Sequence, residues 1–182
     1  HYFGQGFAKA FGIQFADKQN NLAYVHQTSW GISTRLIGGI IMTHGDDEGL
    51  VLPPAVAPIQ VVVVPVAQHK PGVLEKAAEV AQVLRDAGFR VKVDDSEQSP
   101  GWKFAEYEMR GVPLRLELGP RDIEQGVCVL VRRDNREKMA VALDQLAQVV
   151  SQQLDAFAAA IYKKAKDNLD NNTVSARTID EM

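Results

Sequence analysis

A run of β-branched residues near the middle of this 182-residue chain, residues 59–64 with the sequence IQVVVV, determines its fold class. A continuous apolar run of this kind is typical of a strand buried on both faces of a parallel sheet. Residues 72–87 then carry apolar side chains at helical spacing, and Gly88 is expected to end that helix. Residues 89–93 alternate as a strand does. Strand, helix and strand in this order predict a βαβ unit.

The pattern continues with a short helix, two strands and a long helix. Ser99 is placed to cap the short helix and Pro100 to occupy its first position, with the helix ending at Gly111. Residues 112–118 and 126–132 are predicted strands, because the first alternates and the second is apolar. Asp134 and Glu137 have capping-box spacing, which predicts that the long helix begins there. Its apolar stripe comprises Met139, Leu143, Leu146, Val150, Leu154, Phe157 and Ile161.

We therefore predict an α/β protein, with a mixed, mostly parallel sheet flanked by helices over residues 55–164. Residues 1–54 form a separate block. There we expect strand and turn over residues 2–15, a short strand over 22–27, a helix capped by Ser33 or Thr34 and ended by Gly45, and a strand over 50–52. The Gly119–Asp122 segment is expected to be a loop. The dipeptide Pro53-Pro54 is the predicted domain boundary, and residues 165–182 are a predicted connector.

Composition excludes several classes of function. Twenty Lys and Arg residues against 23 Asp and Glu residues give a net charge of −3, which excludes a strongly basic nucleic-acid coat but leaves room for a local basic patch. The single cysteine, Cys128, excludes an internal disulfide framework and is expected to be a buried small hydrophobic residue. No apolar run has the roughly 20 residues of a membrane span. We expect a cytoplasmic protein, of which this chain, starting at His1, is a fragment.

Two local patterns have alternative interpretations. Gly4-Gln5-Gly6 begins like a dinucleotide fingerprint, but the third glycine and the strand-to-helix context are absent. His44, Asp46 and Asp47 could be metal ligands, although a helix end followed by a solvated acidic turn is the favoured interpretation. We therefore predict no metal site.

The stretch Ser29 to Arg35, with the sequence SWGISTR, combines a turn of small residues, an aromatic ring and an arginine at a helix start. Helix N–H groups and a guanidinium together favour phosphate, and the guanidinium plane can stack on a base. The alternative is a capped helix with a surface arginine.

This stretch also carries a family resemblance. Residues 26–38 (HQTSWGISTRLIG), 42–46 (MTHGD) and 49–54 (GLVLPP) resemble motif 3 of class II aminoacyl-tRNA synthetases, specifically prolyl-tRNA synthetases of the archaeal and eukaryotic-like type. Residues 101–104 (GWKF), 111–115 (GVPLR) and 117–122 (ELGPRD) resemble the anticodon-binding domain of that family. The first block is then expected to be a remnant of the antiparallel class II catalytic domain, and the second to be the anticodon-binding domain.

The resemblance implies an aminoacyl-tRNA ligase that activates proline with ATP and Mg²⁺ and transfers it to tRNA(Pro), as a homodimer with no membrane association. It implies ATP contacts by Ser33 and Arg35. It also implies a proline pocket; its lining residues would be His1, Ser29, Trp30 and Gly31. The motifs 1 and 2 of the family do not occur in this sequence, so the chain alone is expected to be inactive and no catalytic residue is assigned.

The anticodon-binding block carries the RNA expectations. By matching positions, Glu108, Arg115 and Arg121 resemble the family's guanine readers. An arginine can bond guanine O6 and N7, and a carboxylate can accept from guanine N–H groups of an unpaired base. The alternative for each is a solvated surface charge. Lys103, Arg132 and Arg133 could add phosphate contacts, or could simply be solvated.

Two other classes of function stay open from the sequence. A stand-alone RNA-binding module or regulatory relative would keep this fold without ligase chemistry. A small-molecule α/β domain would bind no RNA.

Overall fold

The computed structural model describes residues 1–181, which divide into two compact units, residues 1–38 and the described residues from 39 onward. The second unit contains a five-stranded sheet in the order β6-β5-β7-β8-β9. The strands are β5 (Val61–Pro65), β6 (Val91–Val93), β7 (Leu114–Leu118), β8 (Val127–Arg132) and β9 (Lys138–Ala142). Strand β5 is parallel to β6 and β7, whereas β7-β8 and β8-β9 are antiparallel. The predicted mixed sheet is confirmed, but it is not mostly parallel, because two of its four strand pairs are parallel and two are antiparallel.

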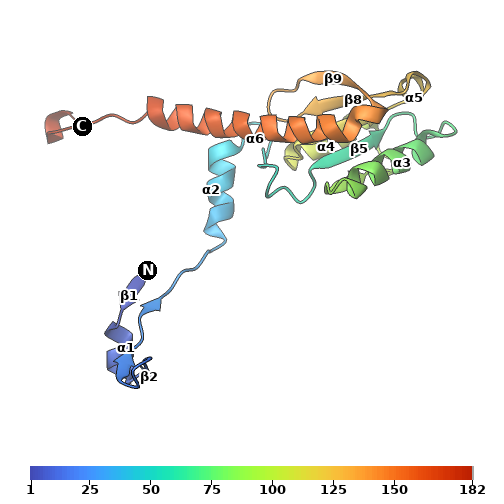
Figure 1. Ribbon diagram of the computed structural model, residues 1–182. Helices are drawn as coiled ribbons and strands as arrows, with labels where there is room; N and C mark the ends of the chain where they lie inside the picture. The colour runs from blue at the N-terminus through green and yellow to red at the C-terminus, as the bar shows by residue number, and fades with distance from the viewer. Residues whose placement is uncertain (182) are drawn as a thin grey trace. The chain divides into compact units, whose positions relative to one another are not determined.

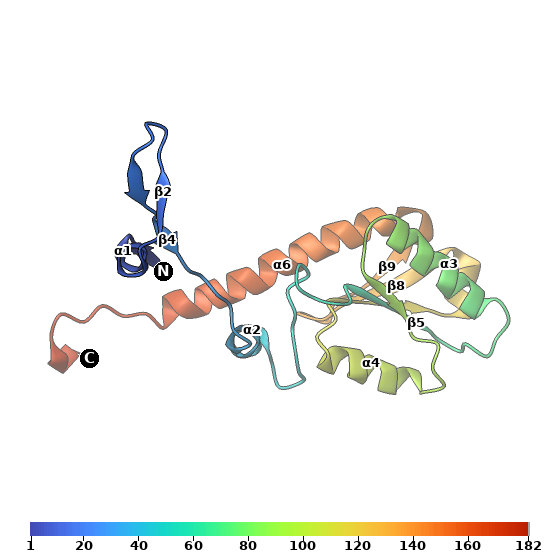
Figure 2. The ribbon, with the colours of Figure 1, turned by 90° about the horizontal axis from the view of Figure 1, so that it is seen from below.

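Helices cover the two faces of this sheet unequally. Helices α3 (Val73–Asp86) and α6 (Leu146–Asn171) pack on one face, where they enclose the main apolar core. Helix α4 (Pro100–Met109) packs on the other face, against Val62 and Val64 of β5. Figure 2 shows α4 on the side of the sheet opposite α3 and α6. The connections β5-α3-β6 and β6-α4-β7 therefore cross opposite faces of the sheet, and the predicted βαβ unit is confirmed.

The alternation along β7 sets up the candidate site. Leu114, Leu116 and Leu118 are fully buried in the core with α3 and α6. Because successive side chains of a strand point to opposite faces, Arg115 and Glu117 lie on the face of α4. The capping of α4 is as predicted, since the Ser99 hydroxyl accepts from the Trp102 N–H and Pro100 is the first helical residue.

The long helix α6, which crosses the sheet in Figure 1, begins later than the capping-box spacing predicted. Residues 138–142 form strand β9, which pairs with β8, and a 3-10 turn (Leu143–Gln145) precedes α6. The sequence KMAVA alternates, so Met139 and Val141 reach the core from a strand as well as they would from a helix. The helix also continues past residue 164 into the predicted connector and ends at Asn171.

Three shorter segments also differ from the predictions. The segment after Gly119 is not a loop, because residues 120–125 form helix α5 (Pro120–Gln125), started by Pro120. Residues 50–52 are not a strand; the N–H groups of Leu50 and Leu52 bond to the carbonyls of Met109 and Gly111. Within residues 2–15 a helix, α1 (Gly6–Phe11), separates two strands.

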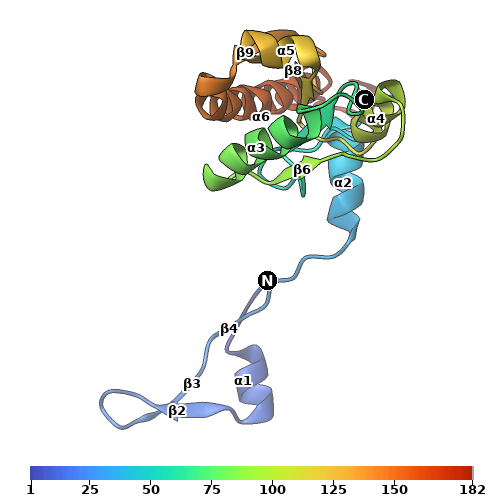
Figure 3. The same cartoon turned by 90° about the vertical axis from the view of Figure 1, so that its right-hand side faces the viewer.

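The first unit has little core of its own. It contains strands β1 (Tyr2–Gly4), β2 (Gln14–Ala16), β3 (Leu22–Tyr24) and β4 (Gln27–Thr28), which pair as the antiparallel ribbons β1-β4 and β2-β3. Figure 3 shows α1 beside the β2-β3 hairpin. Among residues 1–38 only Ala8 is a buried apolar residue. This unit therefore gains little from apolar burial.

Helix α2 (Arg35–His44) is present where the sequence predicted it. The last element described is a 3-10 turn (Ile179–Glu181). Within residues 1–181, the helices are either too short or too polar to cross a membrane. Cys128 is fully buried as predicted, and burial raises the pKa of its thiol to about 12.

Candidate functional site

A cluster of two carboxylates, a guanidinium and a ring lies on the α4 face of the sheet, and we call these four residues (Phe104, Glu108, Arg115 and Glu117) the Arg115 cluster. Arg115 Nη1 donates to Glu108 Oε1 at 2.6 Å, and Arg115 Nε donates to Glu117 Oε1 at 3.1 Å. The guanidinium carbon lies 4.1 Å from the centroid of the Phe104 ring. Arg115 is only 8% exposed, so it is a buried, fully paired cation rather than the solvated charge that the sequence left open.

Local sequence spacing explains how these residues meet. Arg115 and Glu117 are two apart on β7 and share a face, whereas Phe104 and Glu108 are one turn apart on α4. Gly111, with φ of +69°, turns the chain sharply from α4 toward β7. The side chain of Glu117 also lies near the exposed Lys138 of β9, with Nζ 3.6 Å from Oε1.

Glu108 is the member of the cluster that faces solvent. Its side chain is 32% exposed, against 9% for Arg115 and 14% for Glu117. Within residues 1–181, its second oxygen, Oε2, has no hydrogen-bond partner. The crevice between Glu108, Arg115 and Arg133 holds only about 10 Å³, which is too small for a base. A ligand would therefore bond to Glu108 at the surface and not inside the cluster.

Arg121 does not join the Arg115 cluster. It is exposed on α5, beyond the end of β7, and it has no hydrogen bond or ion pair within the described part of the chain. The structure thus brings together two of the three predicted guanine readers, Glu108 and Arg115.

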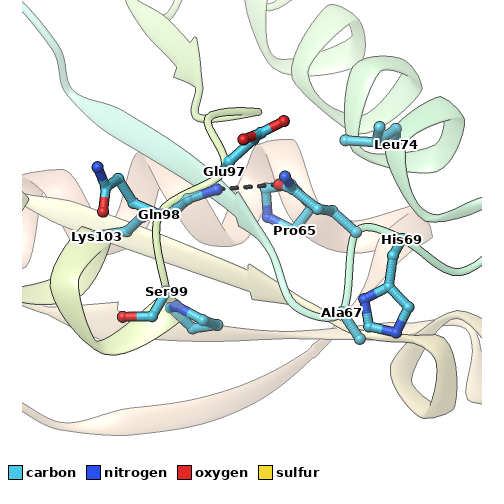
Figure 4. Close-up of a pocket in the computed structure, with 10 residues that line it drawn as sticks. Pro65, Ala67, His69, Leu74, Glu97, Gln98, Ser99 and Lys103 are labelled. Atoms are coloured by element: carbon cyan, nitrogen blue, oxygen red, sulfur yellow. Dashed lines mark hydrogen bonds between the residues drawn. The ribbon is translucent and has the colours of Figure 1, made fainter.

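Lys103 is not available as a phosphate contact. Its side chain is 1% exposed, and Nζ donates to Gln68 Oε1 at 3.0 Å and to the Asp94 carbonyl at 2.9 Å. Figure 4 shows Lys103 beside the end of β5, on the wall of an open cavity of about 630 Å³ that His69, Leu74 and the loop before α4 also line. Lys103 therefore joins the segments that follow β5 and β6, on which Gln68 and Asp94 lie.

Arg132 and Arg133 are also buried and paired. Arg132 donates to both oxygens of Asp134, and Arg133 donates to both oxygens of Asp46 at 2.6 and 2.8 Å. Neither is a surface phosphate contact, since their exposed fractions are 8% and 4%. The pairing of Asp46 with Arg133 also occupies the carboxylate that, with His44 and Asp47, had been considered as a metal ligand.

In the first unit, the structure brings His1 and Ser29 together. The main-chain nitrogen of His1 donates to the Ser29 carbonyl at 2.6 Å, and the Ser29 N–H donates to the His1 carbonyl at 2.9 Å. This pairing extends the β1-β4 ribbon by one residue on each strand. The His1 ring stacks on Phe3 with centroids 6.0 Å apart.

The other residues expected in an ATP and proline site lie after this ribbon, within residues 30–35. Trp30 is 86% exposed, and a side chain at Gly31 would meet nothing within 4 Å. Ser33 and Thr34 accept from the first free N–H groups of α2 through their carbonyls, and Arg35 is the first helical residue and is exposed. No hydroxyl cap from either residue is present among the described contacts. Trp30 and Arg35 are therefore free to contact a ligand.

Sequence reasoning missed three residues that contact the buried arginines Arg115 and Arg133. Glu117 could have been found from its two-residue spacing to Arg115 on an alternating strand. Phe104 could have been found from its one-turn spacing to Glu108. Asp46 gave no usable signal, because its partner Arg133 is 87 residues away in the chain.

Comparison with known proteins finds a family match within the second unit and relatives that match the whole chain. Residues 60–153 match the family described as anticodon binding domain. Over all 182 residues, the chain is 61% identical to a proline–tRNA ligase of Ruminiclostridium cellulolyticum, 59% to one of Lachnospira eligens and 56% to one of Clostridium novyi. The resemblance found in the sequence is confirmed. The chain spans 38% of the length of each of these relatives.

Proposed function

The chain belongs to the anticodon-binding domain family, and from this premise we propose that it is part of a proline–tRNA ligase in which the second unit recognises the anticodon of tRNA(Pro). The parent enzyme would activate proline with ATP and transfer the prolyl group to the tRNA. Identity of 54–61% over the full chain with proline–tRNA ligases supports this proposal.

The observation that carries the proposal is the carboxylate of Glu108, which is partly exposed and has only one of its two oxygens bonded. Arg115 binds one oxygen of Glu108 and leaves the other open to solvent. An unpaired guanine presents N1–H and N2–H groups on its Watson–Crick edge, which a fixed carboxylate can accept from, whereas adenine presents an acceptor at N1. Glu108 would thus contact the base, and Arg115 would hold Glu108 in place.

Arg121 would contribute a separate contact. Because it is exposed and unpaired within residues 1–181, its guanidinium can reach O6 and N7 of a second guanine or a phosphate without breaking an existing ion pair. Arg115 could contact a base directly only by exchanging one of its carboxylate partners.

The first unit would contribute to the ATP and proline site of the parent enzyme. The adjacent His1 and Ser29, together with the exposed ring of Trp30 and the open backbone at Gly31, would line the proline pocket. Ser33 and Arg35, at the start of α2, would contact ATP, where a permanent forked charge and helix N–H groups suit phosphates. Mg²⁺ would accompany ATP. Dimerisation of the parent enzyme, its cytoplasmic location and the inactivity of this chain alone stay predictions.

The test is binding of the chain to an RNA stem-loop with two adjacent anticodon guanines and to the same stem-loop with both guanines changed to adenine, followed by fluorescence anisotropy. We expect the guanine loop to bind more tightly. We define the guanine preference as the dissociation constant of the adenine loop divided by that of the guanine loop, and we expect Glu108→Gln to reduce this ratio about tenfold, because a good base contact is worth roughly 1–3 kcal/mol.

Glu106→Gln is the matched control, since it removes the same charge from the same helix but faces Arg110 and not the cluster. Its ratio should equal that of the unaltered chain. Equal binding of both loops by the unaltered chain would leave an RNA-binding surface that does not read bases. No binding of either loop would favour the small-molecule α/β class.

A further inference from the structure

A short segment that precedes the family match, residues 46–52, lies directly against the end of α4, and we call it the strap. The N–H groups of Leu50 and Leu52 donate to the carbonyls of Met109 and Gly111 at 2.9 and 3.2 Å. The backbones are so close that a Cβ at Gly49 would lie 2.5 Å from the Met109 carbonyl oxygen. The strap therefore contacts Met109 and Gly111, the first and third residues after Glu108.

The strap is closed on itself at its start and packs on α6 near its end. Asp46 and Gly49 bond to each other through their backbones, which closes a tight turn. Val51 is 6% exposed and packs with Phe157 and Ile161 of α6. Together with the hydrogen bonds to Met109 and Gly111, this packing holds the strap against the end of α4, so it can serve as a support.

Arg133 joins the strap to Glu108 through a single guanidinium. Nη1 and Nη2 bind the two oxygens of Asp46, while Nε donates to the backbone carbonyl of Glu108 at 2.8 Å. These hydrogen bonds from Arg133 hold the pKa of the Asp46 carboxyl below its ordinary value. The side chain of Arg133 is 2% exposed and cannot itself reach RNA at the surface.

Glu108 is consequently held at two points. Its carbonyl, near the end of α4, accepts from Arg133 and from the Gly111 N–H, and its carboxylate accepts from Arg115. Together these contacts fix the backbone and the side chain of Glu108, and they direct its open oxygen, Oε2, toward solvent. A hydrogen bond to a base edge weakens steeply when its angle or distance is wrong.

We propose that Arg133 is a positioning residue for guanine recognition by Glu108, and that Asp46 of the strap belongs to the anticodon reader although it lies outside the matched residues 60–153. This inference rests on the proposed function. It assigns to the segment after α2 a role in base discrimination.

The test uses the 182-residue chain, the guanine and adenine stem-loops described above, and the variants Asp46→Asn and Arg133→Lys. Lysine keeps the charge but cannot bond to Asp46 and to the Glu108 carbonyl with a planar fork. We expect each variant to lower the ratio of dissociation constants by at least about fivefold, on the scale of one base contact. Loss of a negative charge in Asp46→Asn should leave binding of the adenine loop equal or tighter.

Asp47→Asn is the matched control, because it makes the same charge change one residue away at an exposed side chain that does not contact Arg133. It should keep the full guanine preference. Thermal melting of each variant shows whether a lost guanine preference comes from a lost fold. If Arg133→Lys fails to fold, the guanine preference of Asp46→Asn decides the test.

Two outcomes would overturn the inference, and they are distinguishable. If Glu108→Gln loses the guanine preference while folded Asp46→Asn keeps it, Glu108 reads the base without the strap, and the proposed function stands. If the unaltered chain shows no guanine preference, the proposed function fails and the inference fails with it.

Discussion

At the scale of single residues, the cation Arg115 illustrates how a charge is kept inside a protein at a recognition surface. Burying an unpaired guanidinium is costly, and here two carboxylates and the face of Phe104 compensate for the loss of water. The cost of removing one partner is greater than the net contribution of the pair, because the remaining charge is left in a poorly solvated place. The Arg115 cluster should therefore respond strongly to single substitutions.

Glu117→Gln provides the residue-scale prediction. It leaves the buried Arg115 with one carboxylate, so we expect the free energy of unfolding to fall by about 1–3 kcal/mol. Urea denaturation measures this change in the free energy of unfolding. Glu106→Gln breaks an ion pair with the exposed Arg110 and should cost no more than about 0.5 kcal/mol. Equal effects of the two substitutions would show that burial does not strengthen the dependence of Arg115 on its partners.

At the scale of secondary-structure elements, the end of α4 is the point at which three segments meet. The helix ends at Met109, Gly111 turns the chain into β7, and the strap lies against both. A side chain has no room here, since a Cβ at Gly111 would lie 2.6 Å from the Leu50 Cβ. The backbone geometry of the site thus depends on a glycine for two reasons, its positive φ and the close approach of Leu50.

Gly111→Ala is the corresponding prediction. It combines an unfavourable φ with a steric clash, so we expect a loss of more than about 1 kcal/mol in the free energy of unfolding. Gly101→Ala is the control, because Gly101 lies in α4 with ordinary φ and nothing within 4 Å of its Cβ position. That substitution should be neutral or stabilising by up to about 1 kcal/mol. A neutral Gly111→Ala in urea denaturation would contradict the close packing of the strap.

At the scale of the whole molecule, the two units differ in how much core each contains. The second unit has buried clusters on both faces of its sheet, whereas the first has one buried apolar residue, Ala8. The first unit exposes the rings of Phe11 and Trp30 at 74% and 86%. Exposed rings and ribbon edges of this kind favour association.

Limited proteolysis tests this difference. We expect cleavage first within residues 1–38, with a core from about residue 39 onward that resists digestion, because local opening costs little where few apolar side chains are buried. Mass spectrometry of the fragments gives the cut sites, and circular dichroism of the resistant core shows whether it keeps its helices. Equal resistance of both units would mean that the first unit is stabilised by contacts absent from this chain, such as association between copies.

Much of the fold followed from local patterns. The apolar run at residues 59–64, the helix at 72–87 and the strand at 89–93 each lie within one short window, and the structure contains all three as β5, α3 and β6. Ser99 and Pro100 likewise specified the start of α4 from their own chemistry. The motif positions of Glu108 and Arg115 were sufficient to place both residues in one candidate site.

Other features were decided by tertiary structure. Residues 138–142 have apolar positions that suit either a strand or a helix, and pairing with β8 selects the strand. The sequence left Lys103 and Arg133 as either phosphate contacts or solvated charges. Their burial depends on Asp94 and Asp46, which other segments bring to them. The sequence by itself determined β5, α3, β6 and α4, because periodicity and capping act within a few residues, and it determined the family through its motifs. Only the tertiary structure decided which charges are buried and paired, because those partners, such as Asp46 and Arg133, are distant in the chain and meet through packing.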